Sequence, residues 1–243
     1  MGISVVFPAY NEEMNIRPTI ERALEAMKSL GQEFEILIVD DRSTDATGSI
    51  ADQLAAEHAE IRVLHNTRNM GQGASLVRGF GEARYDLLTH NGMDYPFDLR
   101  DLSKMLPLTK EADIVVAART ARTGYSRYRV LTSVVHKALL RLLFPPRLSD
   151  YGFVQIYPRP VWQALNVEAR STAFMVPEAL IRAHDMGYRI KEVKIEYLPR
   201  LAGEATSGKP KVILHTLRDM FFFWWKRLLR RTPRRAVGLR PLP

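Results

Sequence analysis

The chain has 243 residues, 46% of them hydrophobic, and contains no cysteine. That length and apolar content suffice for the core of a single α/β domain. The lack of cysteine excludes disulfides, thiolate metal sites and a cysteine nucleophile, and it is compatible with a reducing compartment. A net charge of +8 predicts an anionic partner, such as nucleic acid, phospholipid or a phosphorylated substrate.

The positive charge is concentrated near the end of the chain. Seven of the fifteen residues from 226 to 240 are Lys or Arg, and the remainder of the chain is nearly neutral. The first strand is expected almost at Met1, which leaves no room for a signal peptide. No apolar run approaches the roughly 18 residues of a spanning helix. We therefore expect neither a signal peptide nor a transmembrane helix.

Short apolar strands alternate with helical patterns through the first half of the chain. The patterns predict strands at 3–8, 34–40, 61–65, 85–90 and 113–118, and helices at 15–30, 45–58, 72–84 and 98–107. Strands separated by helices of this length form parallel βαβ units. The expected fold is therefore α/β, with a Rossmann-like, doubly wound and mainly parallel sheet.

The alternation breaks after Arg119. The patterns then predict a helix at about 127–144, a strand at 153–157, a helix at 173–187, a strand at 189–197 and a helix at about 210–231. Residues 1–209 are expected to form one domain that includes the helix at 127–144. The helix at 210–231 and a basic, disordered tail at 232–243 are expected to follow it.

Polar residues collect where the first two strands end. Residues 5–13 read VVFPAYNEE and residues 39–47 read VDDRSTDAT, so each apolar run stops at acidic and amide residues before a helix begins. The carboxyl ends of strands in an open α/β sheet line its ligand-binding crevice. Asn11 or one of the aspartates can equally be a helix cap, so the pattern alone leaves both interpretations open.

Together the two segments resemble the openings of family 2 glycosyltransferases, Pro-x-Tyr-Asn-Glu and Val-Asp-Asp-x-Ser-x-Asp-x-Thr. Over roughly the first 210 residues the chain is similar to polyprenyl-phosphate monosaccharide synthases of the dolichol-phosphate mannose synthase type. The resemblance implies a GT-A fold and a nucleotide-sugar donor. It places Pro8, Tyr10 and Glu12 around the nucleoside. It also places Asp41, with Asp40 beside it, at the imide N–H of a uracil or guanine base.

Residues 69–79, NMGQGASLVRG, resemble the family's Asn-x-Gly-Lys-Gly element, which implies that Gly71 belongs to the donor site. The glycines either let the next helix pack closely on the sheet or form a backbone N–H cradle for phosphate. Gln72 stands where Lys is usual, which removes a cation from the loop. Packing is therefore at least as well favoured as phosphate binding.

Residues 91–99, NGMDYPFDL, occupy the place of the family's Asp-x-Asp motif, which holds Mg²⁺ or Mn²⁺ against the donor diphosphate. Hard cations take oxygen ligands, which two carboxylates supply. Here Gly92 replaces the first acid, Asp94 keeps the second, and Asn91 is a candidate amide ligand. The resemblance thus implies a Mg²⁺ or Mn²⁺ site at Asp94 and Asn91 that Gly92 weakens. The alternative is that Asp94 only caps the following helix.

Four arginines, Arg119, Arg127, Arg129 and Arg200, form a cationic group, and three of them begin or follow segments that match the family. Arg119 follows a strand as in the Ser-Arg-Tyr turn, Arg129 begins an Arg-x-x-x-Ser helix start, and Arg200 begins an Arg-x-x-Gly-x-Ser loop. Guanidinium binds phosphate in a bidentate way, which suits both a donor diphosphate and an acceptor phosphate. Arg119 is assigned to donor binding.

Two acids in the second half have different expected roles. Asp150 stands where the family has an Asp before Gly-Phe, and it is either a catalytic carboxylate or a turn residue. Glu178, next to Pro177, is expected to support the fold at a helix start. The residues expected to take part in catalysis are Asp94, Arg129, Arg200 and Asp150.

The final predicted helix carries an apolar stripe, the run FFFWW at 221–225 and a basic cluster. It can pack on the domain, but this combination is typical of a helix at a membrane interface, and anionic headgroups attract the basic residues. The helix at 127–144 is a second amphipathic candidate. Contiguous aromatic residues do not match the stacking positions that nucleic-acid-binding proteins space along a sheet.

The resemblance implies an inverting glycosyltransferase that moves a monosaccharide from a UDP- or GDP-sugar to a polyprenyl phosphate. It is expected to be peripheral, on an anionic membrane surface at the cytoplasmic face, with no nucleic-acid partner. Two alternatives stay open. One is transfer to a hydroxyl on a lipid or glycan, with Asp150 or a neighbour as base. The other is a non-catalytic scaffold, which Gly92 motivates.

Overall fold

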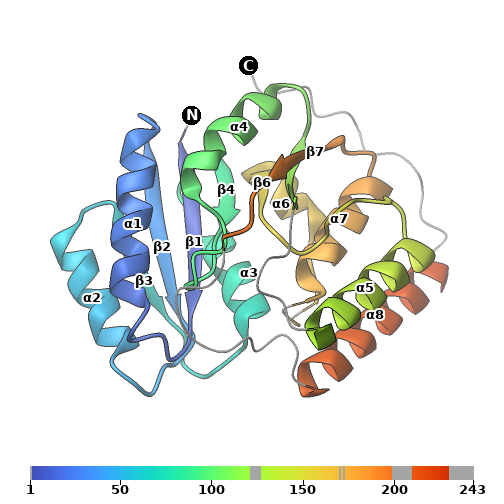
Figure 1. Ribbon diagram of the computed structural model, residues 1–243, viewed down its shortest axis with the longest axis horizontal. Coiled ribbons are helices and arrows are strands. Elements are labelled where there is room, and N and C mark those ends of the chain that lie inside the picture. The colour runs from blue at the N-terminus through green and yellow to red at the C-terminus, as the bar shows by residue number, and fades with distance from the viewer. Residues whose placement is uncertain (1, 121–126, 170, 172, 199–209, 230–243) are drawn as a thin grey trace.

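The computed structural model describes residues 2–120, 127–169, 171, 173–198 and 210–229 (Figure 1). The strands are β1 (Ile3–Ala9), β2 (Phe34–Asp40), β3 (Ile61–His65), β4 (Leu87–His90), β5 (Ile114–Arg119), β6 (Gln155–Pro158) and β7 (Ile190–Ile195). The helices are α1 (Ile16–Ser29), α2 (Thr47–Glu57), α3 (Gln72–Glu82), α4 (Leu102–Met105), α5 (Arg127–Leu143), α6 (Arg159–Leu165), α7 (Met175–Asp185) and α8 (Pro210–Leu229). The 3₁₀ segments η1 (Leu99–Asp101) and η2 (Leu106–Lys110) flank α4.

The strands form a seven-stranded sheet in the order β3-β2-β1-β4-β6-β5-β7. β1 pairs in parallel with β2 and β4, β2 with β3, and β5 with β7. β6 runs antiparallel to both of its neighbours, β4 and β5. The predicted α/β class with a mainly parallel sheet is confirmed. Because β1 to β5 point the same way, their carboxyl ends lie along one edge of the sheet.

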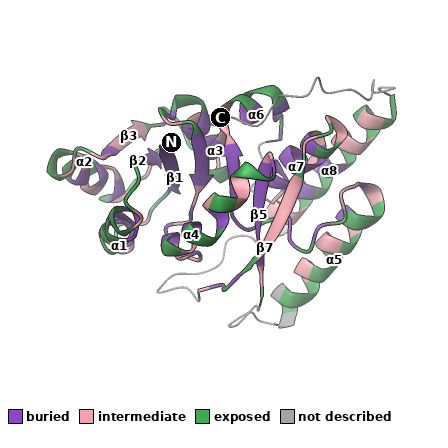
Figure 2. Cartoon of the chain, turned by 90° about the horizontal axis from the view of Figure 1, so that it is seen from above, coloured by how far each residue is buried: buried purple, intermediate pink, exposed green. Residues whose placement is uncertain are grey.

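The two faces of the sheet carry separate cores. Ile3, Val5 and Phe7 of β1 belong to the core beneath α1, α2 and α4, whereas Val6 belongs to the core beneath α3, α6 and α7. All seven residues of β1 are buried, as Figure 2 shows by colour. A strand covered on both faces is mainly apolar, which explains why β1 lacks the alternation of a half-exposed strand. Its one polar side chain, Ser4, donates to Glu35 Oε1 at 2.7 Å.

Two segments differ from the sequence-based expectation. The helix predicted at 98–107 is divided into η1, a single turn of α-helix and η2, which has Pro107 near its start. Proline has no N–H to continue an α-helical ladder. α6 was not predicted, because its seven residues are too few for a helical period to stand out and it has Pro160 in its first turn.

α5 and α8 lie together at one end of the molecule (Figure 1). Large apolar side chains are exposed on both helices, among them Leu131 and Val134 of α5 and Phe221 and Trp225 of α8. Of the helices that the structure describes, none combines the length and the apolar character needed to span a bilayer.

Candidate functional site

Polar side chains from the ends of five parallel strands meet along one edge of the sheet. Each follows or ends an apolar strand, so the fold brings together residues that are far apart in sequence. In chain order they are Tyr10 after β1, Asp40 and Asp41 at the end of β2, Asn66 after β3, Asn91 after β4 and Arg119 at the end of β5.

The loops after β1 and β2 are hydrogen-bonded to each other. The Asn11 amide donates to Ser43 Oγ at 3.1 Å, and Asn11 Oδ1 accepts from the Thr44 amide at 2.9 Å. The Glu12 amide donates to Thr47 Oγ1 at 2.7 Å. Asn11 has φ 54°, a left-handed conformation that asparagine tolerates better than most residues. The two segments that suggested the family therefore build one rigid rim.

The residues expected around the nucleoside lie on or beside this rim. Pro8 is buried within β1, and Tyr10 has 46% of its surface exposed where the strand ends. Glu12 Oε2 accepts from Asn15 Nδ2 at 2.7 Å. Of the three, Tyr10 has the side chain most open to an incoming planar ring. Their roles in donor binding stay predictions.

Asp40 is buried and held by its own loop and by His65. Asp40 Oδ1 accepts from the Ser43 amide at 3.0 Å, and Oδ2 lies 3.0 Å from His65 Nδ1. Burial disfavours the charged carboxylate, but the hydrogen bonds with Ser43 and His65 outweigh it and lower the pKa of Asp40. The other ring nitrogen of His65 lies 3.0 Å from Asp52 Oδ1. Bonds with Asp52 and Asp40 raise the pKa of His65.

Asp41 holds the loop that precedes α3. One carboxylate oxygen accepts from Asn66 Nδ2 at 2.7 Å and the Met70 amide at 2.8 Å, and the other accepts from the Gly71 amide at 2.7 Å. Gly71 has φ +86°, which favours glycine at this turn. Asp41 is only 2% exposed, so a base imide would have to join or replace these internal donors.

Sequence reasoning missed the residues behind Asp41. Asn66 Nδ2 also donates to Ser75 Oγ at 2.9 Å, and Arg78 Nη1 donates to Asn66 Oδ1 at 2.5 Å and to the His65 carbonyl at 2.7 Å. Arg78 thereby fixes which end of the Asn66 amide faces Asp41. The rule that polar residues gather at strand ends would have found Asn66, which directly follows β3.

The candidate metal loop offers a different set of groups from the one expected. Asn91 is 1% exposed, its Nδ2 donates to the Phe97 carbonyl at 2.7 Å, and its Oδ1 accepts from the Gly92 amide at 3.0 Å. As a metal ligand, Asn91 would have to use the second lone pair of Oδ1, on a side chain that is almost fully buried. Asp98 caps the turn after the loop by accepting from the Arg100 amide at 3.1 Å.

Asp94 is therefore not needed as the cap of that turn and is half-buried beside Gly92. In the part of the chain that the structure describes, no cluster of three or more His, Cys, Asp or Glu side chains is arranged to hold a metal ion. The loop itself supplies a single carboxylate, Asp94, before its turn. A hard cation at this edge would need further oxygen ligands from a bound molecule or water.

Arg119 and Asp150 form a bidentate ion pair. Arg119 Nε lies 2.5 Å from Asp150 Oδ2, and Nη2 lies 2.8 Å from Oδ1. The Arg119 guanidinium also lies 5.2 Å from the centre of the Phe153 ring. Glu192 Oε1 accepts from the amides of Ser149 and Asp150 at 2.7 and 3.3 Å. Two candidate site residues from distant segments are thus brought together, and Glu192 on β7 holds the turn that carries one of them.

The other predicted cations are placed less fully. Arg129 lies in the first turn of α5, and its side chain is outside what the structure describes. Arg200 and the tail at 232–243 also lie outside the described residues. Their assignments stay predictions.

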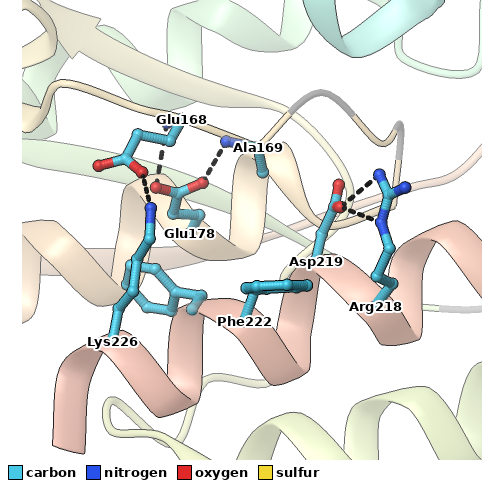
Figure 3. A pocket seen from close by; sticks show the side chains of 8 residues that line it. Glu168, Ala169, Glu178, Arg218, Asp219, Phe222 and Lys226 are labelled. Atoms are coloured by element: carbon cyan, nitrogen blue, oxygen red, sulfur yellow. Dashed lines mark hydrogen bonds and ion pairs between the residues drawn. The ribbon is translucent and has the colours of Figure 1, made fainter. Parts of the chain in front are cut away.

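A cavity of about 310 Å³ lies between α8 and the segment before α7, as Figure 3 shows. Four of its charged groups form two pairs: Lys226 with Glu168 at 2.6 Å, and Arg218 with Asp219 at 3.2 Å. Glu178 is 1% exposed and accepts from the amides of Glu168 and Ala169, so its expected structural role is confirmed. None of the strand-end residues lines this cavity.

Comparison with known proteins gives a family match and two informative relatives. A family model described as glycosyl transferase family 2 matches residues 4–162. Glycosyltransferase AglD of Haloferax volcanii is 30% identical over 247 residues, which cover 98% of this chain and 39% of AglD. Undecaprenyl-phosphate 4-deoxy-4-formamido-L-arabinose transferase of Photorhabdus laumondii is 31% identical over 216 residues, which cover 87% of this chain and 64% of that protein. The chain thus spans less than two thirds of either relative.

Among solved structures, glucosyl-3-phosphoglycerate synthase from Mycobacterium tuberculosis, in complex with Mn²⁺, UDP-glucose and phosphoglyceric acid, superposes with a TM-score of 0.69. The match covers 92% of this chain and 80% of that one at 17% identity. A likeness at this identity establishes the shared fold.

Proposed function

Because the chain belongs to glycosyl transferase family 2, we propose that it transfers a monosaccharide, with inversion, from a UDP- or GDP-sugar to a polyprenyl phosphate at a membrane surface. The observation that carries the proposal is the gathering of Tyr10, Asp40 and Asp41 with Asp94 and Arg119 at one sheet edge. The acceptor class is supported by the Photorhabdus relative, whose name describes an undecaprenyl-phosphate transferase.

The strand-end edge suits a nucleotide diphosphate chemically. Tyr10 has an exposed ring on which a nucleotide base could stack. Asp41 accepts hydrogen bonds from two backbone amides in the loop that precedes α3. Arg119 and Asp94 provide a cation and an oxygen ligand near the place of the diphosphate in this proposal. Mg²⁺ or Mn²⁺, when bound, supplies charge neutralisation for the leaving diphosphate.

A phosphate acceptor needs little activation. It already carries negative charge at neutral pH, so a strong general base is less important than for a sugar hydroxyl. Rate acceleration would then depend on holding acceptor and donor in line and on stabilising the charge of the leaving group. Arg119 is assigned the second task, with part of its charge offset by its ion pair with Asp150.

The ion pair between Arg119 and Asp150 weighs against a hydroxyl acceptor. Both Asp150 oxygens accept from the guanidinium, and one also accepts from the Gly152 amide at 3.1 Å. These bonds engage Asp150 with Arg119 and Gly152, so the proposal assigns Asp150 no role as a general base. In the proposed reaction Asp150 instead orients Arg119, which requires no proton transfer.

The exposed apolar faces of α5 and α8 support the membrane part of the proposal. On α8, Phe221 and Trp225 stack at 6.4 Å between ring centres and are 59% and 50% exposed, with Leu217 and Leu228 also exposed. Met220 and Phe223 of the same helix pack inward. α8 therefore has one apolar face for the protein core and a second that can enter the headgroup region of a bilayer.

The first basic residues of the C-terminal cluster anchor α8 to the body. Lys226 Nζ lies 2.6 Å from Glu168, and Arg227 forms a bidentate pair with Asp185 at 2.6 and 2.7 Å. These two charges are thus already paired within the protein. Attraction to anionic lipid would fall to the basic residues that follow α8 in the sequence.

The proposal is tested by sugar transfer from radiolabelled UDP- and GDP-sugars into a membrane-lipid extract, with Mg²⁺, Mn²⁺ or EDTA. We expect label in a lipid that mild acid releases, as for a glycosyl phosphate, and loss of that label with Asp94→Ala. An acid-stable lipid product would instead indicate a hydroxyl acceptor. Nucleotide binding without transfer under any of these conditions would indicate the non-catalytic scaffold.

A further inference from the structure

Gly92 lies directly against the carboxylate of Asp94. A Cβ atom added to Gly92 would lie 2.4 Å from Asp94 Oδ1, a distance that real Cβ atoms do not show. Its next neighbours would be Pro96 Cδ and Cγ at 3.4 and 3.6 Å, which is ordinary contact. Gly92 is not among the glycines with positive φ, so its backbone suits any L residue. The Asp94 carboxylate alone takes the room that a side chain here would need.

We propose that Gly92 is a positioning residue, whose missing side chain provides the space in which the Asp94 carboxylate is held at the donor edge. The inference rests on the proposed function in one respect: it takes Asp94 to be a donor-site group. Under this inference, the glycine that replaces the first acid of Asp-x-Asp determines where the carboxylate of the second acid, Asp94, can lie.

The loop around Gly92 is anchored on both sides. The Asn91 amide donates to the Val6 carbonyl at 3.1 Å, and the Tyr95 amide donates to the Gly92 carbonyl at 3.0 Å. Thr19 Oγ1 donates to the Met93 carbonyl at 2.7 Å from α1. Because the backbone is held while Asp94 Oδ1 is the far end of a short side chain, an added methyl should displace the carboxylate and leave the loop in place.

The test compares Gly92→Ala, Asp94→Ala and the double variant for Mn²⁺ binding by electron paramagnetic resonance, with UDP and separately with GDP. We expect Gly92→Ala to weaken Mn²⁺ binding about 10- to 100-fold, the usual effect of disturbing a group that orients a ligand. The double variant should bind no more weakly than Asp94→Ala, because both changes act through one carboxylate. Melting temperatures should be unchanged.

Gly81→Ala is the matched control, because a Cβ there meets nothing within 4 Å. It should bind Mn²⁺ as the wild type does. Gly92→Asp adds an acid but displaces Asp94, so it should bind Mn²⁺ no more tightly than the wild type. Tighter binding would mean that both acids fit at once, which contradicts the inference.

Other outcomes separate this inference from the proposed function. Wild-type Mn²⁺ binding in Gly92→Ala, with loss in Asp94→Ala, would overturn the positioning role and leave the proposed function intact. Full binding in Asp94→Ala, or none in the wild type, would overturn the inference together with the metal role of Asp94. Failure of the proposed function would show as a protein that binds Mn²⁺ and nucleotide normally yet transfers no sugar. A crystal structure of Gly92→Ala gives a ligand-free readout: an unmoved Asp94 over a shifted backbone would also contradict the inference.

Discussion

Asp40 and Asp41 are adjacent acids that the fold stabilises in different ways. Asp40 pairs with His65 and caps its own loop, whereas Asp41 accepts three N–H groups from the segments after β3. Two neighbouring buried carboxylates would otherwise repel each other and favour the protonated form. This division of partners keeps both side chains at the strand end, and it leads to two predictions about single residues.

The first prediction concerns pH. The pKa of His65 is raised above its ordinary value of 6.5, so its bonds to Asp52 and Asp40 stabilise the fold fully below that value and are lost as pH rises through the raised pKa. The lowered pKa of Asp40 acts at the acidic end, where stability is lost as pH falls through it. Because His65 is half-exposed, solvent weakens these bonds. We expect the free energy of unfolding to fall by only about a few tenths of a kcal/mol between pH 5.5 and pH 8.5.

Urea unfolding of the wild type and His65→Asn across that range measures the effect. The free energy of unfolding of the wild type should fall as the pH rises through the raised pKa of His65, and the variant should lack part of that fall. Parallel curves for wild type and His65→Asn would contradict the assignment.

The second residue-scale prediction concerns Asn66. Asn66→Ala removes one donor from the buried Asp41 carboxylate and should lower the free energy of unfolding by about 1–3 kcal/mol. Asn66→Asp should cost more, because it places a second negative charge against Asp41. Hydrogen exchange measures the loosening of the loop. The backbone amides of Met70 and Gly71, which donate to Asp41, should exchange faster in both variants. Unchanged exchange at these amides in both variants would show that Asn66 does not hold the loop.

The residue types at the strand ends could be predicted from the sequence, whereas their partners could not. Strand ends marked by Asp40 and Asn91 follow from where apolar runs stop. That Asp150 would pair with Arg119 depends on the antiparallel β6 bringing a turn next to β5, which local patterns do not encode. The hydrogen bond from the Asn91 side chain to the Phe97 carbonyl likewise depends on the path of the chain between the two residues.

At the scale of elements, the strands and the long helices were predictable, whereas the short helical segments were not. The predicted strands match β1 to β7, and the predicted long helices match α1 to α3, α5, α7 and α8, within a few residues. α6 has too few residues to show a period, and the segment from η1 to η2 mixes two helix types around Pro107. On α8, the periodicity identifies the apolar residues, and only the structure shows which of them are buried.

The stripe predicted on α8 turns out to serve two surfaces. Met220 is 2% exposed and Phe223 lies 5.7 Å from the ring of Phe144, whereas Phe221 and Trp225 point into solvent. A helical wheel shows one broad apolar face on α8. It does not show which residues of that face are buried against the domain and which are exposed to solvent. The inward half holds the helix on the domain, and the outward half is free to meet another apolar phase.

The element-scale prediction follows from that division. Phe221→Ser combined with Trp225→Ser should weaken binding to anionic phospholipid vesicles at least tenfold, since each ring contributes about 2 kcal/mol on burial. Thermal stability should be unchanged, because both rings are exposed. Vesicle sedimentation measures the binding, with Met14→Ser as control for loss of an exposed apolar side chain on the body. Equal sedimentation of the double variant and the wild type would contradict a membrane role for this face.

At the scale of the whole molecule, the sheet separates two tasks. The carboxyl ends of β1 to β5 carry the polar residues of the proposed donor site, while α5 and α8 at one end carry the exposed apolar faces (Figure 1). A soluble nucleotide sugar and a membrane-borne phosphate would thus approach from different sides. Arg119 ends β5 and Asp150 precedes β6, so both belong to the half of the sheet that includes β5, β6 and β7. β5 and β7 lie on the same side of the molecule as α5 and α8 (Figure 2).

Donor binding at the strand-end edge can be measured by hydrogen–deuterium exchange with and without UDP- and GDP-sugars. We expect one class of donor to slow exchange at residues 10–13, 40–47, 66–73 and 91–95, because bound nucleotide would cover these loops and order them. Protection confined to residues 166–169 and α8, beside the cavity of Figure 3, would instead place the ligand at the other end of the molecule and rule out donor binding at the strand-end edge.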